Sequence, residues 1–210
     1  MVLTPVLSFI IGLIASFLGA LPFGPINLSV VDTTVRKSLQ AGLWLALAAA
    51  LVEILQSFVA VHCSMWISQA IQASPWVKIA AFILFIGLGL FFFFKKGIKK
   101  EKEEQKSGGN FVRGMIISLL NPQAIPFWIF VLTYLEMTQM IEINTQQKLH
   151  LVLLFLLGVA VGKFLALLGF GLLSKTIRNK TDFINQWMNK IIGTILIIIG
   201  IFQGFQIFTG

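Results

Sequence analysis

The stretch Leu39 to His62, LQAGLWLALAAALVEILQSFVAVH, is apolar for long enough to cross a bilayer and carries one acidic residue, Glu53. A second apolar stretch, 149–173, carries Lys163 at the matching place. Each of the two lies about fourteen residues into its stretch, which is mid-bilayer depth at ~1.5 Å of helix rise per residue. Ionisable groups at that depth cost about 2.5–3.5 kcal/mol each on insertion scales, so both residues are candidates for function.

The chain as a whole is strongly apolar, since 57% of its 210 residues are hydrophobic and only 11% are charged. Such a chain cannot bury its apolar surface in a small soluble core. A transmembrane helix needs about 20 residues, and six stretches reach that length: 5–31, 39–62, 76–94, 113–135, 149–173 and 185–208. We therefore expect an all-α, polytopic membrane protein in which residues 1–210 form a single transmembrane domain of six helices.

Basic residues gather in the loops on one side of these stretches. The chain has 16 Lys and Arg against 8 Asp and Glu, an excess that in a soluble protein would suggest a nucleic-acid partner. Here the basic loops follow the odd-numbered spans, so the positive-inside rule places them in the cytoplasm and both termini outside. We expect the bacterial inner membrane, no nucleic-acid partner, and a cytoplasmic linker at 95–112 that separates a first half, 1–94, from a second half, 113–210.

The first helix of each half is interrupted. The run LPFGPIN at 21–27 and the run NPQAIPFW at 121–128 contain prolines, which remove backbone donors, and Gly24 permits backbone angles that other residues resist. An unwound backbone at membrane depth is tolerated only where protein or a water-filled cavity satisfies it, so both breaks should face inward. The two groups of three spans run in opposite orientations, which predicts two inverted three-helix repeats with broken first and fourth helices.

These motifs resemble the LysE/RhtB superfamily of amino-acid exporters, which are small six-span proteins of about this length. Gly24-Pro25-Ile26-Asn27-Leu28 is similar to the Pro-Gly-Pro-Asn signature of the family's first helix. Glu53 takes the place of an Asp that is usual in the second helix. Asn121-Pro122-Gln123-Ala124 is similar to the fourth-helix signature Asn-Pro-Lys-Ala, with Gln123 in place of the lysine. The resemblance implies the export of amino acids or related small molecules.

We therefore predict a secondary transporter, an antiporter that exports amino acids or related small zwitterions or amines by proton-coupled alternating access. Half-helix ends with free amides or carbonyls suit the ammonium and carboxylate of a zwitterion. The candidate substrate-binding residues are Gly24, Pro25, Asn27, Glu53, Asn121, Pro122, Gln123 and Lys163. Glu53 is also the candidate for proton coupling, and Asp32 with Arg36 is a candidate inner gate.

Other interpretations stay open at each of these positions. Glu53 and Lys163 could neutralise one another as a structural pair, or Lys163 could extend its charge to the membrane interface. The prolines could be plain kinks, and Asn27 and Asn121 could form hydrogen bonds between helices. Two glycines four residues apart, at 158 and 162, predict a close helix contact, and glycine seams of this kind are compatible with a homodimer.

The sequence contains no pattern that is typical of an enzyme or a cofactor protein. Cys63 is the only cysteine, so a disulfide within the chain is excluded, and His62 and His150 are the only histidines. They do not belong to a cluster of three or four metal ligands, and no nucleophile stands at a recognisable spacing from a base. We expect no enzymatic activity, no metal and no cofactor. The alternative functions are a membrane scaffold or assembly factor that transports nothing, and a small-solute channel.

Overall fold

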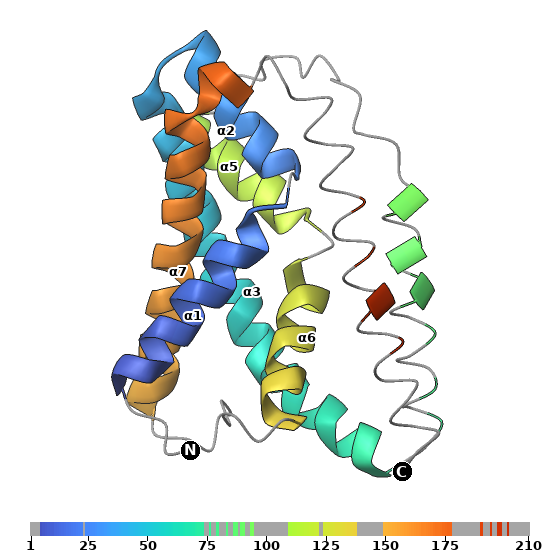
Figure 1. The fold of residues 1–210 in the computed structure, drawn as a ribbon. Helices are drawn as coiled ribbons and strands as arrows, with labels where there is room; N and C mark the ends of the chain where they lie inside the picture. The colour runs from blue at the N-terminus through green and yellow to red at the C-terminus, as the bar shows by residue number, and fades with distance from the viewer. Residues whose placement is uncertain are drawn as a thin grey trace. The chain divides into compact units, whose positions relative to one another are not determined.

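The structure is a computed structural model that describes residues 5–22, 24–73, 109–121, 124–137 and 149–177, and single positions within 76–94 and 190–201. The described segments are helical with short turns, as expected for an all-α chain (Figure 1). In chain order the helices are α1 (Pro5–Ala20), α2 (Pro25–Arg36), α3 (Leu39–Ala73), α5 (Asn110–Leu119), α6 (Ala124–Met137) and α7 (Leu149–Leu172).

Two of these helices are long and apolar enough to cross a membrane, α3 over Leu39–Cys63 and α7 over its whole length. The first predicted span is broken as expected, because α1 and α2 are bent by 76° and reach spanning length only together. The fourth predicted span is likewise divided into α5 and α6. The predicted spans 76–94 and 185–208 lie outside the described residues except at single positions, so the number of six spans stays a prediction.

Contacts along the chain group it into two compact units. One unit is Met1–Ser68 with Gln105–Asn179, and the other is Gln69–Glu104 with Lys180–Gly210. Each unit draws on both of the predicted sequential halves, 1–94 and 113–210, and the division into halves joined by the linker 95–112 stays a prediction. The first unit contains the broken helices, α7 and most of α3, and all of the contacts described below lie within it.

Helix α1 packs along α7 through small residues. A Cβ added to Gly158 would strike the carbonyl of Phe9, and a Cβ added to Gly162 would strike the carbonyl of Leu13. Residue numbers rise in the same direction along both helices from the first contact to the second, so α1 and α7 are parallel. The buried face of α1 consists of residues four apart, which are Ser8, Gly12, Ser16 and Ala20. The predicted close contact of the glycine pair is confirmed, and its partner is α1 of the same chain, so these glycines give no support to the expected homodimer.

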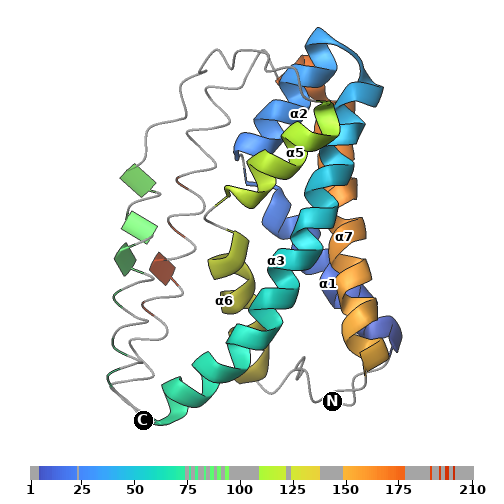
Figure 2. The same ribbon diagram turned by 180° about the vertical axis from the view of Figure 1, so that it is seen from behind.

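Helix α5 packs on α3 in a similar way. A Cβ added to Gly114 would lie 2.7 Å from the carbonyl oxygen of Leu45 and 3.0 Å from the Cβ of Ala48. Seen from behind, α5 crosses the first part of α3 (Figure 2). Both seams rest on glycine because only a residue without a side chain lets two helix backbones approach this closely.

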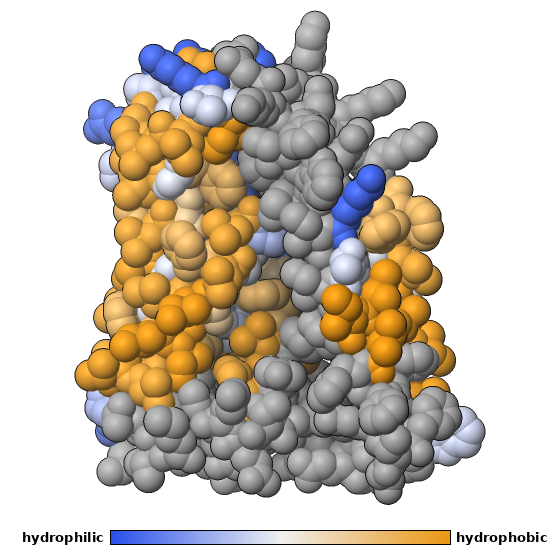
Figure 3. Space-filling view, in the orientation of Figure 1, coloured by the Kyte–Doolittle hydropathy of each residue, from blue (hydrophilic) through white to orange (hydrophobic). Residues whose placement is uncertain are grey.

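The outward faces of the same helices are apolar. On α1, exposed residues again stand four apart, on the face away from α7: Val6, Ile10, Ile14 and Leu18. Apolar surface covers most of the described part of the molecule in the space-filling view (Figure 3). A contiguous apolar surface of this extent is unfavourable in water, whereas lipid chains solvate it. In the two long apolar helices, the polar side chains of Glu53, Gln56 and Lys163 are buried.

One end of the bundle is basic. The Nζ of Lys37 donates a hydrogen bond to the Oδ1 of Asn110 at 3.4 Å, and an Nη1 group of Arg113 donates to the Oγ1 of Thr33 at 3.5 Å. Residues that border the first and second basic loops therefore meet at one end, which we call the basic end. This agrees with the common side predicted for these loops. The assignment of that side to the cytoplasm, and of the termini to the outside, stays a prediction.

Candidate functional site

The two ionisable residues from the middle of the long spans form a buried ion pair. The Nζ of Lys163 lies 3.0 Å from the Oε2 of Glu53, and the two side chains are 8% and 6% exposed. One comes from α7 and the other from α3. Placing a charge in an apolar interior costs several kcal/mol, and direct contact with good geometry is what offsets that cost. The contact predicted by the structural-pair interpretation is present, and the interpretation that Lys163 extends to the interface is wrong.

Trp128 of α6 is a third member of this centre. Its indole Nε1 donates a hydrogen bond to the Oε1 of Glu53 at 2.9 Å, and its side chain is fully buried. Each carboxylate oxygen of Glu53 therefore has a donor, one charged and one neutral. We call Glu53, Lys163 and Trp128 the ionic centre. The sequence analysis quoted Trp128 within the second break without giving it a role, although a buried tryptophan generally needs an acceptor for its N–H group.

Gln56 lies on the same face of α3 as Glu53, about one helical turn further on. Its Nε2 donates a hydrogen bond to the backbone carbonyl of Ser118 at 2.9 Å. Ser118 is near the end of α5, where the last carbonyls of a helix have no partner within the helix. Gln56 therefore caps the second break from another helix. Sequence reasoning missed this residue, and the signal that could have found it is an amide one turn from Glu53 in an otherwise apolar stretch.

Asn27 closes the first break from within its own span. Its Nδ2 donates to the carbonyl of Ala20 at 2.7 Å and to that of Pro22 at 3.1 Å, and the residue is 2% exposed. The side chain thus reaches back from α2 to the carbonyl end of α1. This is a hydrogen bond between helices, as one interpretation predicted, but it joins two pieces of one broken span.

The reason that we gave for Gly24 is wrong. Its backbone has φ −122° and ψ 177°, an extended conformation that any residue adopts. The physical reason is the next residue, because proline disfavours the helical conformation of the residue before it, and Pro25 then begins α2 at a position where proline is favoured. No described atom lies within 4 Å of a Cβ added to Gly24, and Pro25 is exposed. Both residues therefore shape the break, and Gly24 borders open space among the described residues.

The second break is described in part. Pro122 and Gln123 lie outside the described residues. Asn121 is half-buried, its backbone N–H donates to the carbonyl of Ser118 at 3.2 Å, and its own carbonyl accepts from the N–H of Ala124 at 3.5 Å. The chain therefore turns tightly from the end of α5 towards the start of α6.

The candidate inner gate forms an ion pair on a single helix. The Nε of Arg36 lies 2.7 Å from the Oδ1 of Asp32, and the side chains are 58% and 42% exposed. An exposed pair of this kind contributes only about 0.3–0.5 kcal/mol. Because it connects two positions of α2, this contact does not itself join two elements across a passage. Its role as a gate stays a prediction.

Other polar groups near the site have donors or acceptors that are not used in a hydrogen bond. Within the described segments, the buried hydroxyl oxygens of Ser16 and Ser118 have no hydrogen-bond partner. The ammonium of Lys163 has three donors, of which the contact with Glu53 occupies one. No group of three or more His, Cys, Asp and Glu side chains in this described part could hold a metal ion. The arrangement can bind charged and polar groups of a small molecule.

One of the comparisons with known proteins finds a match. Residues 17–206 match the family described as LysE type translocator. The match includes both breaks and all three residues of the ionic centre. Comparison with curated proteins and with solved structures gives no match. The apolar helices and the extent of the family match lead to one conclusion: the chain is a membrane protein that belongs to the LysE type translocator family.

Proposed function

We propose that this translocator exports amino acids or related small zwitterions or amines by proton-coupled alternating access, with the Glu53–Lys163 pair as its substrate site. The observation that carries the proposal is the buried 3.0 Å ion pair between the two unbroken spans. The family makes transport of a small molecule the general function. The chemistry of the pair suggests which molecules are transported.

An ion pair in an apolar interior is suited to exchange with a zwitterion. The ammonium of an amino acid can replace Lys163 on the carboxylate of Glu53, while its carboxylate replaces Glu53 on Lys163. Every charge then keeps a partner throughout the exchange, which avoids the cost of a buried unpaired charge. Within the proposed substrate class the pair therefore favours zwitterions, because a plain amine would bind Glu53 and leave Lys163 without an anion. The unfilled donors of Lys163 and the hydroxyls of Ser16 and Ser118 support the binding of further polar groups.

Competition for one carboxylate supports an antiport mechanism. Glu53 can release Lys163 only if another positive group, such as a proton or the ammonium of a substrate, takes its place. Proton and substrate would then bind alternately, which is the requirement for exchange. The chain contains no recognisable nucleotide-binding motif, so an ion gradient is the expected source of energy.

Two reciprocal contacts support alternating access by inverted halves. Helix α1 packs on α7 through Gly158 and Gly162, and α5 packs on α3 through Gly114. The first helix of each predicted half thus packs on the second span of the other half. Each break is also capped by a buried amide, Asn27 at the first and Gln56 at the second. Matching contacts of this kind favour a rocking motion of one half against the other around a central site.

The experiment is counterflow of radiolabelled amino acids into proteoliposomes that contain the purified protein. We expect saturable exchange that depends on a proton gradient and that both Glu53→Gln and Lys163→Met abolish. Lys175→Met is the matched control, because it removes a lysine that is exposed beyond the end of α7 and should leave exchange unchanged. Folded protein that exchanges no amino acid in the panel would contradict the proposed substrate class.

The same experiment separates the alternative functions. The internal pairing of Glu53, Lys163 and Trp128 would also suit a membrane scaffold, in which charges only set the helix geometry. A scaffold would show no exchange and would keep its assembly in Glu53→Gln. A small-solute channel would pass solutes without saturation and without dependence on the proton gradient.

A further inference from the structure

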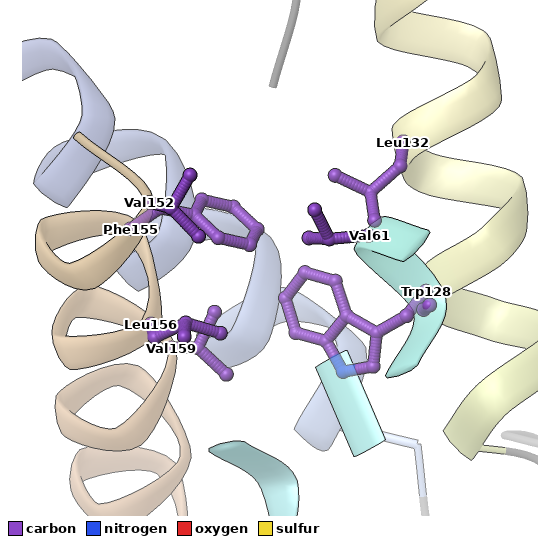
Figure 4. Close-up of a cluster of buried hydrophobic side chains, with 8 residues drawn as sticks. Val61, Trp128, Leu132, Val152, Phe155, Leu156 and Val159 are labelled. Atoms are coloured by element: carbon purple, nitrogen blue, oxygen red, sulfur yellow. The ribbon is translucent and has the colours of Figure 1, made fainter. Parts of the chain in front are cut away.

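A cluster of apolar side chains covers one side of the ionic centre. We call it the aromatic plug, and it consists of Ala60, Val61, Trp128, Leu132, Val152, Phe155, Leu156 and Val159. Figure 4 shows residues of α3, α6 and α7 converging, with the indole ring of Trp128 facing the ring of Phe155. The side chain of Phe155 is fully buried, as is that of Val61. The plug is therefore a dry barrier.

The plug lies on the side of the ionic centre that is away from the basic end. Helix α3 begins at the basic end, and Val61 lies about two turns beyond Glu53 along it. Helix α7 finishes at the basic end, since a Cβ added to Gly171 would lie 3.1 Å from the Cδ1 of Leu39. Phe155 lies about two turns before Lys163. A solute that leaves the ionic centre between α3, α6 and α7 towards the far end would pass the plug.

Trp128 belongs to both the plug and the ionic centre. Its ring packs edge-on against Phe155 with centroids 5.7 Å apart, while its Nε1 donates to the Oε1 of Glu53 at 2.9 Å. The indole is a rigid plane with only two side-chain torsions, so the hydrogen bond and the position of the ring cannot change independently. The geometry therefore joins the charge state of Glu53 to the packing of the plug.

Binding at Glu53 weakens the hydrogen bond that holds Trp128. A hydrogen bond to a carboxylate is about twice as strong as one to a neutral acceptor, and a proton on Glu53 removes that advantage. A substrate ammonium that bonds the Oε1 of Glu53 takes the acceptor away from the indole N–H of Trp128. A buried indole N–H with a poor acceptor is unfavourable, so the ring reorients to find another one. Because the ring also fills the plug, reorientation opens the barrier beside Phe155.

The neighbouring residue carries the same movement to the first break. Phe127 packs edge-on against Trp128 with centroids 5.3 Å apart, and a Cβ added to Gly19 would strike the ring of Phe127. Gly19 is near the end of α1, beside the carbonyl that Asn27 caps. A shift of the first turn of α6 would therefore change the contact between Phe127 and α1.

We propose that Trp128 is a positioning residue that couples occupancy of Glu53 to the opening of the aromatic plug, an inference that rests on the proposed transport function. Trp128→Phe separates its two roles, because it keeps a ring in the plug and removes the N–H donor. Trp128→Ala removes both. Trp44→Phe is the matched control, since Trp44 is 49% exposed on α3 and touches neither the plug nor Glu53 in the described segments.

The test measures access to the ionic centre from the far side of the plug. A reporter cysteine is introduced as Ser57→Cys in a Cys63→Ser background, one turn beyond Glu53 on the same buried face. Cells are treated from the far side with a membrane-impermeant thiol reagent, with and without the substrate identified by counterflow. Without substrate we expect the reporter cysteine to be protected from labelling. Substrate should raise the labelling rate by about tenfold, which is the change that corresponds to the loss of one hydrogen bond to a charged group.

The variants give the outcomes that support or overturn the inference. In Trp128→Phe we expect protection to persist and the effect of substrate to disappear, while Trp128→Ala labels quickly in both conditions and Trp44→Phe behaves as the parent. A substrate effect that persists in Trp128→Phe, or protection that persists in Trp128→Ala, would overturn it.

Exchange kinetics without the reporter provide a second measurement. Trp128→Phe should lower the maximal exchange rate by about tenfold with little change in KM, because opening follows binding. An unchanged maximal rate would overturn the inference while leaving the proposed function intact, whereas a parent protein without any exchange would contradict the proposed function itself.

Discussion

The two broken helices satisfy their backbone in different ways. At the first break, Asn27 reaches back to the carbonyls of Ala20 and Pro22, so both pieces of the span are held by a residue of that span. At the second break, the side chain of Gln56 donates to the carbonyl of Ser118. Gln56 belongs to α3, the helix that also carries Glu53 about one turn away. The first break is closed locally, whereas the second is tied to the helix that holds the charge. The difference suggests that the second break responds to what Glu53 binds.

The helices that follow the two breaks also differ in whether their polar side chains bond within the same helix or to another helix. After the first break comes α2, whose charged residues pair on their own helix. After the second break comes Trp128, whose indole N–H is bonded to Glu53. Variants at the two breaks can therefore separate a structural kink from a moving part of the site.

The largest effect is expected when one partner of the ion pair is removed. Lys163→Met leaves the carboxylate of Glu53 buried without its cation, and Glu53→Gln leaves the ammonium of Lys163 without its anion. We expect each single change to lower the free energy of unfolding by about 3–5 kcal/mol and to abolish exchange. Thermal unfolding in detergent and counterflow would measure the two effects. The double variant should recover most of the stability and none of the exchange, and a double variant that exchanges normally would contradict the proposed site.

A smaller effect is expected from the two amides, and it tests the comparison directly. Asn27→Leu leaves the buried carbonyls of Ala20 and Pro22 without their side-chain donor, which costs about 1–3 kcal/mol of stability. Gln56→Leu should cost less, because the carbonyl of Ser118 keeps the backbone N–H of Asn121 as a donor. We expect Asn27→Leu to reduce stability with little change in the KM for exchange, because its bonds stay within the first span. Gln56→Leu should also change the KM, because Gln56 shares its helix face with Glu53. Equal effects on KM would show that the two breaks do not differ in function.

A serine at position 24 is expected to have a smaller effect on the free energy of unfolding, and one of opposite sign. It is the N-cap of α2 without a side-chain hydrogen bond, in an extended conformation and beside open space. We expect Gly24→Ser to raise the free energy of unfolding by only a few tenths of a kcal/mol, since serine can accept from the first turn of the helix but glycine is itself a good N-cap residue. Gly24→Ala is the comparison and should lower the free energy of unfolding by roughly 1 kcal/mol, because alanine is a much poorer N-cap residue than glycine. Loss of exchange in Gly24→Ala would indicate that the open space is occupied by substrate.

The smallest effect is expected at the exposed pair on α2. Asp32→Asn removes a contact that contributes only about 0.3–0.5 kcal/mol, so the unfolding temperature should hardly change. If Asp32 is part of an inner gate, exchange should nevertheless become leaky, which an unpaired efflux assay without external substrate would detect. Tight exchange in this variant would contradict the gate.

Local patterns explain which parts of the molecule could be predicted. Composition and the lengths of the apolar stretches predict a membrane protein, and the proline pairs predict the two breaks. The four-residue spacing of Gly158 and Gly162 predicts a close helix contact. These predictions succeed because each depends on residues that are neighbours in the chain or on one face of one helix. The reason given for Gly24 failed because the conformation before a proline is set by the proline.

The sequence by itself determined that Glu53 and Lys163 stand in the middle of two apolar stretches of spanning length, because this follows from their positions along the chain. Only the tertiary structure decided that these two side chains meet, that Trp128 donates to the second carboxylate oxygen, and that the amide of Gln56 is used at Ser118. Hydropathy and helical period specify which face of a helix is buried and at what level. They do not specify which helix lies opposite, since that depends on packing between residues far apart in the chain, such as the glycine seams that bring α1 to α7 and α5 to α3.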